Sequence, residues 1–537
     1  MGLEGFDAMR TDNSAYDGLS VADGKTGFSP IAELKRAAID AYVWQVLKDH
    51  VDESTYTRDG SGYSFKRKLA PPRTSPFGPD PDLSKMPHTY KLTPPTFDGN
   101  NLQGGGDLTK TQDKGVRYAD DNSDDKFINQ HNFADGFQQV NNRIDRALEP
   151  WLSLPDPNPI VDELCGSGGN FKNAYDLLAV AGGDTGVTGS SDLAFYLRTL
   201  IVDHDDAMEG ASWYAFRTKY AHAMPGAVNG NFQLLCAGGS ALAGEQQVFA
   251  KARQGVVNIV NSATDVFSKA ATPSTAKAGL KVSTTAAIGA AVVAAVATVA
   301  TGVGPAGVAL AVGGAGLQIV EKVADDREEV SKANGNGNYD GAMTAFEGCL
   351  TDLNEEIKKS EKELKAKLDY NVANVTGRNG GTGKGGPTEE ERLKAEKPYG
   401  VNFAAIDPEN GGTLSIKKDQ SGNGTEVREG VIGNDLPGIE RNLLDAVESV
   451  KQHGKLCGGL IKKDSRIGIG ADGANDNNLM VFLSKFVNEL ATETNLAKRN
   501  LELTVECLET QDAASSAEIK KVIADINERE KRSVLPE

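Results

Sequence analysis

The pattern of apolar and polar positions divides the chain around one long run without charged side chains, residues 282–320. Its first arm, 284–301, consists mostly of alanine and valine. A Gly-Val-Gly-Pro sequence at 302–305 interrupts it, and a second apolar arm, 306–320, follows. Because glycine and proline break helices, this pattern predicts two helices joined by a turn.

Amphipathic helical patterns precede this run. In the segment 133–151, apolar residues are three or four positions apart until prolines stop the pattern after Leu154. The segment 211–269 is longer and carries an apolar residue at every seventh position, so it is expected to pack against other helices. Its predicted helix-packing face consists of Val228, Leu235, Leu242, Phe249, Val256 and Val260. The alternate heptad positions include Gly239, Gln246 and Arg253, which favours a multi-helix bundle over a two-stranded coiled coil.

Further helical patterns lie near both ends of the chain and after the apolar run. Ser29-Pro30 is typical of a helix start, and helical spacing continues to about residue 50. A heptad-like stripe at 340–372 predicts a helix that covers the apolar run. From residue 439 onward the pattern predicts two long antiparallel helices, and 514–530 is interpreted as a third helix or a frayed tail.

Two segments rich in proline, glycine and polar residues lack periodicity and are expected to be irregular. The predicted fold class is therefore all-α: long antiparallel helical hairpins in a multi-helix bundle, with a central apolar Ala/Gly/Val hairpin and Pro/Gly-rich irregular arms. The predicted regions are an N-terminal helix (1–51), a Pro/Gly/Asp-rich arm (52–126), a helical bundle that includes the apolar hairpin (127–372), a Gly-rich polar linker (373–438) and a C-terminal helical hairpin (439–537).

Composition argues against several classes of partner and site. The chain has 537 residues and a net charge of −18, which argues against a nucleic-acid partner because phosphate binding relies on clustered lysine and arginine. Five cysteines form no Cys-x-x-Cys pair, so neither a zinc site nor a disulfide framework is indicated. Cys236 and Cys507 occupy helical apolar positions, where a buried free thiol is expected. The N-terminus lacks the features of a cleaved secretion signal, and export by another route stays open.

Motifs that resemble chemical sites each lack a required feature. The glycines of 468–473 match a dinucleotide fingerprint, but charged residues precede them where a buried strand is needed. The acidic segment 120–131 ends in His131 where a calcium loop needs a bidentate glutamate. His204 is flanked by aspartates that point in different directions on a helix. We therefore expect no catalytic residues, no cofactor and no metal, and a protein that is not an enzyme. An enzyme with its site in the Gly-rich segments is the minor alternative, because spacing along the chain does not reveal a catalytic triad assembled in space.

The stretch from Met208 to Phe216, with Tyr220 beyond it, resembles the turn and second-helix start of WXG100-like proteins, the helical-hairpin substrates of type VII (ESX) secretion in actinobacteria and their relatives. In that family a Trp-x-Gly joins two antiparallel helices. Here Gly210 matches, whereas Met208 stands in place of the tryptophan. The residues of this WXG-like turn are Met208, Gly210, Trp213, Phe216 and Tyr220. The order of the flanking segments, over about 130–370 and more loosely 439–510, adds to the resemblance.

The resemblance implies a non-enzymatic, type VII-associated helical protein that is secreted or directed to the cell surface without a cleaved N-terminal signal, and cytoplasmic before export. It would act through self-association or through a small WXG100-like helical partner, with the type VII machinery as a further partner. No tyrosine is followed four positions later by an acid, so the usual export signal of the family is missing. Export would then depend on a partner that carries the signal.

An alternative function uses the apolar run. About 18 apolar residues nearly cross a bilayer core, so residues 282–320 are also a candidate membrane hairpin of a helical pore-former. The residues of this candidate membrane hairpin are Ile288, Val292, Val293, Val296, Val299, Gly304, Pro305, Val308, Leu310 and Val312. The competing interpretation is a buried Ala/Gly-rich helix pair inside a soluble bundle, because this composition is less hydrophobic than a leucine-rich span.

Overall fold

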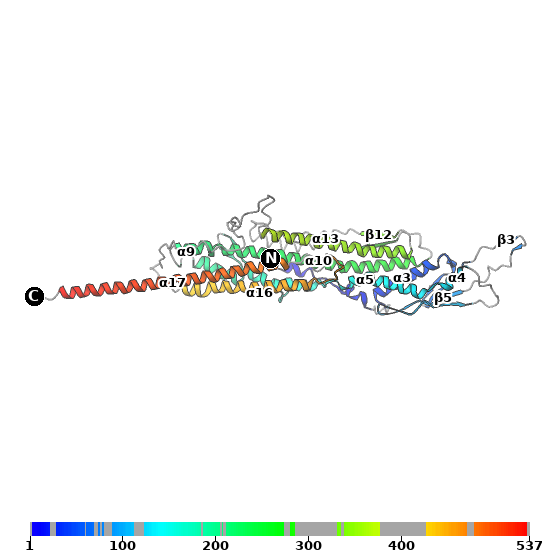
Figure 1. The fold of residues 1–537 in the computed structure, drawn as a ribbon, viewed down its shortest axis with the longest axis horizontal. Helices are drawn as coiled ribbons and strands as arrows, with labels where there is room; N and C mark the ends of the chain where they lie inside the picture. The colour runs from blue at the N-terminus through cyan, green and yellow to red at the C-terminus, as the bar shows by residue number, and fades with distance from the viewer. Residues whose placement is uncertain are drawn as a thin grey trace, which may run out of the picture.

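The structure is a computed structural model. It describes residues 3–21, 28–59, 61–68, 74–75, 78–79, 89–111, 123–183, 186–204, 207, 211–272, 280–284, 330–334, 338–375, 426–469 and 477–533. The described elements are mostly helical and form an elongated rod in which long helices run side by side (Figure 1).

Helix α10 (Met224–Ala270) is the spine of the rod. It packs against α13 (Tyr339–Val375), α3 (Pro30–Leu47) and the first part of α17 (Asn477–Ser533). Most of its side chains are buried on every face, which a helix rich in alanine and glycine tolerates because its neighbours can approach closely. This arrangement confirms the prediction of a multi-helix bundle.

A second long pair consists of α16 (Leu436–Leu460) and α17, which run antiparallel and form the most extensive helix contact in the described part of the molecule. The predicted C-terminal hairpin is thus confirmed. The expectation of a separate third helix or frayed tail at 514–530 is wrong, because α17 continues through that segment to Ser533. The reason lies in the sequence: 477–533 contains neither proline nor glycine, so no residue interrupts the helix.

Local sequence signals fix several helix starts. The side chain of Ser29 accepts a hydrogen bond from the backbone N–H of Ala32, with Pro30 in the first turn of α3, as expected of an N-cap. Asn132 caps α5 (Phe133–Leu148) in the same way through Asp135. The shorter helical elements are α1 (Glu4–Asp7), α2 (Ser14–Asp17), η1 (Gly18–Ser20), η2 (Glu53–Thr55), α4 (Ser123–Gln130), η4 (Glu149–Ser153), α6 (Asn158–Cys165), α7 (Asn170–Leu178), α8 (Asp192–Arg198), η5 (Thr199–Asp203), α9 (Ala211–Phe216), η6 (Arg217–Ala221) and η8 (Glu426–Asp435).

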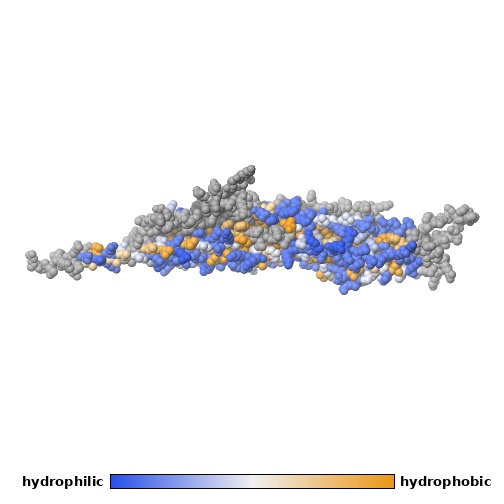
Figure 2. Space-filling model, in the orientation of Figure 1, coloured by the Kyte–Doolittle hydropathy of each residue, from blue (hydrophilic) through white to orange (hydrophobic). Residues whose placement is uncertain are grey.

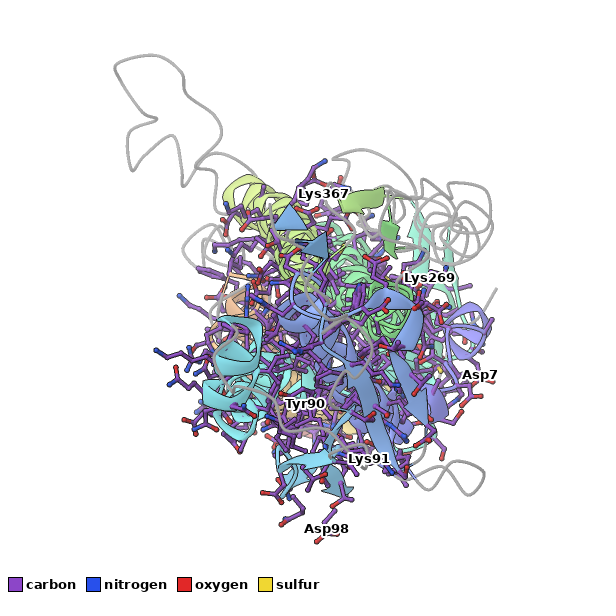
Figure 3. The ribbon with its side chains drawn as sticks, turned by 90° about the vertical axis from the view of Figure 1, so that its right-hand side faces the viewer. Asp7, Tyr90, Lys91, Asp98, Lys269 and Lys367 are labelled. Carbon is purple, nitrogen blue, oxygen red and sulfur yellow. The ribbon has the colours of Figure 1, made fainter. Side chains whose placement is uncertain are left out.

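The all-α prediction is wrong for the region 52–126, which contains a four-stranded antiparallel sheet. Its order is β1 (Thr57–Asp59), β2 (Gly62–Lys66), β5 (Thr89–Leu92) and β8 (Leu108–Thr111). Figure 3 looks along the rod from the end that carries this sheet, with Tyr90 inside the outline of the molecule and Asp98 at its edge. The buried side chains of the sheet alternate along only two short strands: Tyr63, Phe65, Tyr90 and Leu92. Such short alternation is easily masked by the surrounding prolines and glycines.

Most of the central apolar run lies outside the described residues, so its predicted helical hairpin stays a prediction. Its beginning does not match that prediction, since Val282 to Thr284 belong to strand β11 (Leu280–Thr284). This strand pairs antiparallel with β12 (Val330–Asn334), with Val282 opposite Lys332. Both strands contact α13. The start of the run is therefore paired with a segment that begins ten residues after its end, and both lie beside the helix that was expected to cover the run.

Candidate functional site

The described part of the WXG-like turn forms an aromatic stack. Trp213, Phe216 and Tyr220 are three and four positions apart, so they share one helix face. The ring centroids are 5.1 Å apart for Trp213 and Phe216, and 5.3 Å apart for Phe216 and Tyr220. All three are buried. Met208 and Gly210 lie outside the described residues, so the turn itself remains a prediction.

Tyr220 links this stack to the C-terminal hairpin. Its hydroxyl donates a hydrogen bond to Thr494 Oγ1 on α17 at 2.7 Å. Burial raises the pKa of Tyr220 well above its ordinary value, and the hydrogen bond to Thr494 only partly offsets that effect. The stack therefore serves as a packing site between distant parts of the chain, rather than as a source of ionisable groups.

The predicted helix-packing face of α10 is buried throughout: Val228, Leu235, Leu242, Phe249, Val256 and Val260. The polar or small residues at the alternate positions have specific neighbours. Gly239 lies against the ring of Phe171. Gln246 donates a hydrogen bond to the backbone carbonyl of Met9 at 2.7 Å, and Arg253 donates one to the backbone carbonyl of Leu154 at 2.9 Å. These three positions, which are unfavourable in a two-stranded coiled coil, thus contact α7, the N-terminal segment and the Pro-rich turn after α5.

The most chemistry-like cluster, which sequence reasoning missed, consists of Glu163, His453 and Cys457. His453 Nδ1 lies 2.8 Å from Glu163 Oε1, and both side chains are buried. Burial raises the pKa of Glu163, but hydrogen bonds from His453 and from the backbone of the α7 start outweigh it, so the net pKa is lowered. Phe171 N–H also donates to Glu163 Oε1 at 3.1 Å. Glu163 therefore ties α6 and the start of α7 to α16.

The position of the Cys457 sulfur does not suit a nucleophile activated by His453. The sulfur lies 3.5 Å from Nε2 and 3.9 Å from Nδ1. A thiol aligned with the Nε2 lone pair would be about 2 Å farther from Nδ1 than from Nε2, because the two nitrogens lie on opposite sides of the ring. The sulfur instead lies beside both nitrogens, and Cys457 is buried. We interpret the cluster as a buried polar network that fixes helix packing.

A second buried charged group holds the turn between α16 and α17. Lys463 forms an ion pair with Glu361 of α13, and Glu361 also accepts a hydrogen bond from the Ile469 backbone N–H at 2.7 Å. Gly468, in this turn, has a φ of +65°, and its N–H donates to Asn354 at 2.8 Å. The 468–473 glycines therefore begin in an interhelical turn that docks on α13, and not in a strand-to-helix phosphate loop.

The five cysteines are free thiols. Cys236 is buried as expected, whereas Cys507 is exposed, so that expectation is wrong for Cys507. Its position in α17 lies past Val505, the last buried side chain of that helix in the described part. Within the described ranges no three acidic, histidine or cysteine side chains are placed to hold a metal ion.

The projecting end of α17 is the clearest unpartnered helix surface. In Figure 1 its final turns extend past the other helices of the rod. Ile519, Val522 and Ile523 lie three and four positions apart and are exposed by 58%, 54% and 51%. Elsewhere, the face in Figure 2 is dominated by hydrophilic residues with apolar ones scattered among them.

The candidate membrane residues 288–312 lie outside the described part. No helix among the described residues is long and apolar enough to cross a membrane. Comparison of the chain with protein-family models, with curated proteins and with solved structures gives no match.

Proposed function

We propose that the protein acts by assembly, as a type VII-associated helical protein that is secreted or surface-directed, and that copies of the chain associate through the projecting end of α17. The observation that carries the proposal is the apolar stripe of Ile519, Val522 and Ile523 on a helix that has left the bundle.

The physical argument starts from the stability of an isolated helix. Among the side chains of α17 that the structure describes, Val505 is the last buried one, and the helix continues to Ser533, about 40 Å farther at 1.5 Å per residue. Isolated helices in water are marginal, and most helical stability in proteins comes from packing an apolar face. A second helix laid on the stripe would supply that packing. A second copy of α17 is the partner that the chain itself provides.

The test measures the solution mass of the purified chain at micromolar concentration. We expect a multiple of the 56.8 kDa chain mass. The substitution Val522→Lys places a charge on the stripe and should return the protein to the monomer mass. Ala524→Lys is the matched control, because it adds the same charge to an exposed position on the opposite side of the helix. A wild-type monomer, or equal effects of both substitutions, would overturn self-assembly.

The export part of the proposal rests on the resemblance to WXG100-like proteins and needs its own experiment. In native cells with an intact type VII system, the chain should be found outside the cytoplasm, and inactivation of that system should retain it. Recovery only from the cytosol while other substrates are exported would overturn this part. That result would leave the measurement of self-assembly unaffected.

The alternative of a membrane-active protein rests on residues 282–320. Dye release from liposomes over a range of pH and lipid composition tests it, with a chain that lacks 286–328 as the comparison. Release that requires the segment would favour the pore-former, and absence of release would end that proposal.

A further inference from the structure

A groove of about 440 Å³ lies between α5, α13 and the turn that joins α16 to α17. The apolar part of its lining comprises Ala147, Pro150, Trp151, Leu350 and Ile467. Trp151, Leu350 and Ile467 are buried, so they form a closed floor. The groove is therefore built from three elements that are far apart in the sequence but held together in the fold.

Three arginines surround this floor. Arg143 and Arg146 lie three positions apart on α5, and Arg466 comes from the α16–α17 turn. Arg143 is fixed by Glu347 of α13, which accepts from Nε at 2.7 Å and from Nη2 at 2.8 Å. Tyr339 also forms a side-chain hydrogen bond with Arg143, so this guanidinium is held by partners within the chain.

Arg466 is held in place from two sides. Asp464 accepts from its Nε at 3.0 Å and from its Nη2 at 2.8 Å, and Glu149, at the end of α5, accepts from Nη1 at 3.1 Å. These bonds bring the guanidinium to the same end of α5 as Arg146. The position of the charge is thus set before any ligand arrives.

Arg146 differs from the other two arginines. Across the part of the chain that the structure describes, its side chain has no hydrogen-bond or ion-pair partner. The residues that line the groove carry three positive charges and one negative charge, that of Glu347. Glu149 and Asp464 balance Arg466 but do not line the groove. Arg143 and Arg466 are thus paired with carboxylates, and Arg146 carries the uncompensated positive charge of the groove.

We propose that this groove binds a small organic oxyanion, a carboxylate or phosphate group attached to an apolar body. Arginine matches the planar, two-oxygen geometry of such groups and binds them with strong charge-assisted hydrogen bonds. A site with an apolar floor and a few convergent polar groups is the usual form of a small-molecule pocket. Arg146 is the principal ligand, and the paired Arg143 and Arg466 hold the elements that form the groove in place around it.

Isothermal titration of the full chain at low ionic strength tests the proposal with four probes: phenyl phosphate, benzoate, inorganic phosphate and benzyl alcohol. Phenyl phosphate or benzoate should bind more tightly than inorganic phosphate, because only they cover the apolar floor. Benzyl alcohol should not bind. The tighter of phenyl phosphate and benzoate identifies whether the site prefers a phosphoryl or a carboxylate group.

The substitution Arg146→Gln should weaken binding of the preferred anion by roughly tenfold to a hundredfold, the usual effect of losing a charged hydrogen bond. Arg499→Gln, at an exposed position on α17, is the control for loss of one surface charge and should leave binding unchanged. Three results would each overturn the proposal: no binding of either aromatic anion, equal binding of benzyl alcohol, or equal effects of the two substitutions. If inorganic phosphate binds as tightly as phenyl phosphate, the apolar floor plays no part and the proposed ligand class is wrong.

Discussion

The hydroxyl of Tyr63 in strand β2 donates a hydrogen bond to the carboxylate of Asp40 in helix α3 at 2.5 Å. Arg58 of β1 forms an ion pair with the same carboxylate, which is only 2% exposed. Burial raises the pKa of Asp40 to about 6, although Arg58 and Tyr63 both lower it. Asp40 therefore joins the sheet to the bundle and is also a carboxyl group with a raised pKa.

This raised pKa predicts how stability depends on pH. Because the folded protein holds the Asp40 proton more tightly than the unfolded chain, whose pKa is near 3.8, the resulting stabilisation is complete below about pH 4 and is lost as the pH rises through about 6. The free energy of unfolding should fall by up to about 3 kcal/mol over that range from this group alone. In Asp40→Asn, urea denaturation at several pH values should show a flatter dependence than in the wild type.

The control for this prediction is Asp98→Asn, which removes an exposed carboxylate at the β6–β7 turn (Thr96–Asp98 and Asn101–Gln103). The control should keep the pH dependence of the wild type. If the wild type and Asp40→Asn have equal slopes between about pH 4 and about pH 6, Asp40 does not titrate in this range in the folded protein.

Substituting two glycines of α10 by alanine distinguishes the effect of close packing on stability from the effect of helix propensity. A Cβ at Gly239 would lie 2.2 Å from Phe171 Cζ, whereas a Cβ at Gly226, which is exposed, would meet nothing within 4 Å. Gly239→Ala should therefore destabilise the protein by about 1–3 kcal/mol through overpacking. Gly226→Ala should be neutral or slightly stabilising, because alanine is the better helix former. Urea denaturation of both variants gives the comparison, and equal effects would show that α7 does not pack against α10 at Gly239.

The helices of the rod follow from sequence because their apolar periodicity extends over many turns. The face of α10 and the cap at Ser29 are examples in which local pattern and tertiary packing agree. The sheet was missed because its buried residues come from strands of four or five residues within a segment rich in proline and glycine. Tyr63 and Tyr90 alternate correctly with their neighbours, but over lengths too short to distinguish from chance.

The polar sites were less accessible to sequence reasoning, because they join residues far apart in the chain. His453 and Cys457 are four positions apart on one helix, a visible signal, but Glu163 is 290 residues away from His453. Arg466 reaches Glu149 over 317 residues. Spacing cannot reveal such pairs, since they depend on how α5, α6, α13 and α16 pack. The burial of Cys507 was wrongly expected because periodicity identifies an apolar face but does not indicate where its partner helix ends.

The bond between Tyr220 and Thr494 should couple the aromatic stack to α17. Tyr220→Phe removes the donor from a fully buried site and should cost about 1–2 kcal/mol of unfolding free energy. Thr494→Val should cost a similar amount, and in the double variant the two costs should not add. Tyr214→Phe is the control, because Tyr214 belongs to the same segment but is 67% exposed. Additive effects in the double-variant cycle would mean that the two side chains do not interact in solution.

The five thiols should react with a thiol reagent in an order set by exposure. Thiolates are the reacting species, and burial disfavours both their access and their ionisation. Cys507 is exposed and should react first, whereas Cys165 is half-buried, with a pKa raised chiefly by burial, and should react more slowly. Cys236, Cys349 and Cys457 are buried and should react only after denaturation. Cys507→Ser should remove the fast phase of the reaction.

The same measurement tests whether Cys457 is an activated nucleophile. Its sulfur lies beside both ring nitrogens of His453 and not in line with the Nε2 lone pair. This geometry does not allow His453 to take the thiol proton of Cys457 through Nε2. We expect His453→Gln to leave the labelling of Cys457 in the folded protein unchanged, at a level near zero. Rapid modification of Cys457 in the native wild type, lost in His453→Gln and rising with pH as an imidazole titrates, would contradict this interpretation. Such a result would make the cluster with Glu163 a catalytic candidate, since a histidine oriented by a carboxylate is the usual activator of a cysteine nucleophile.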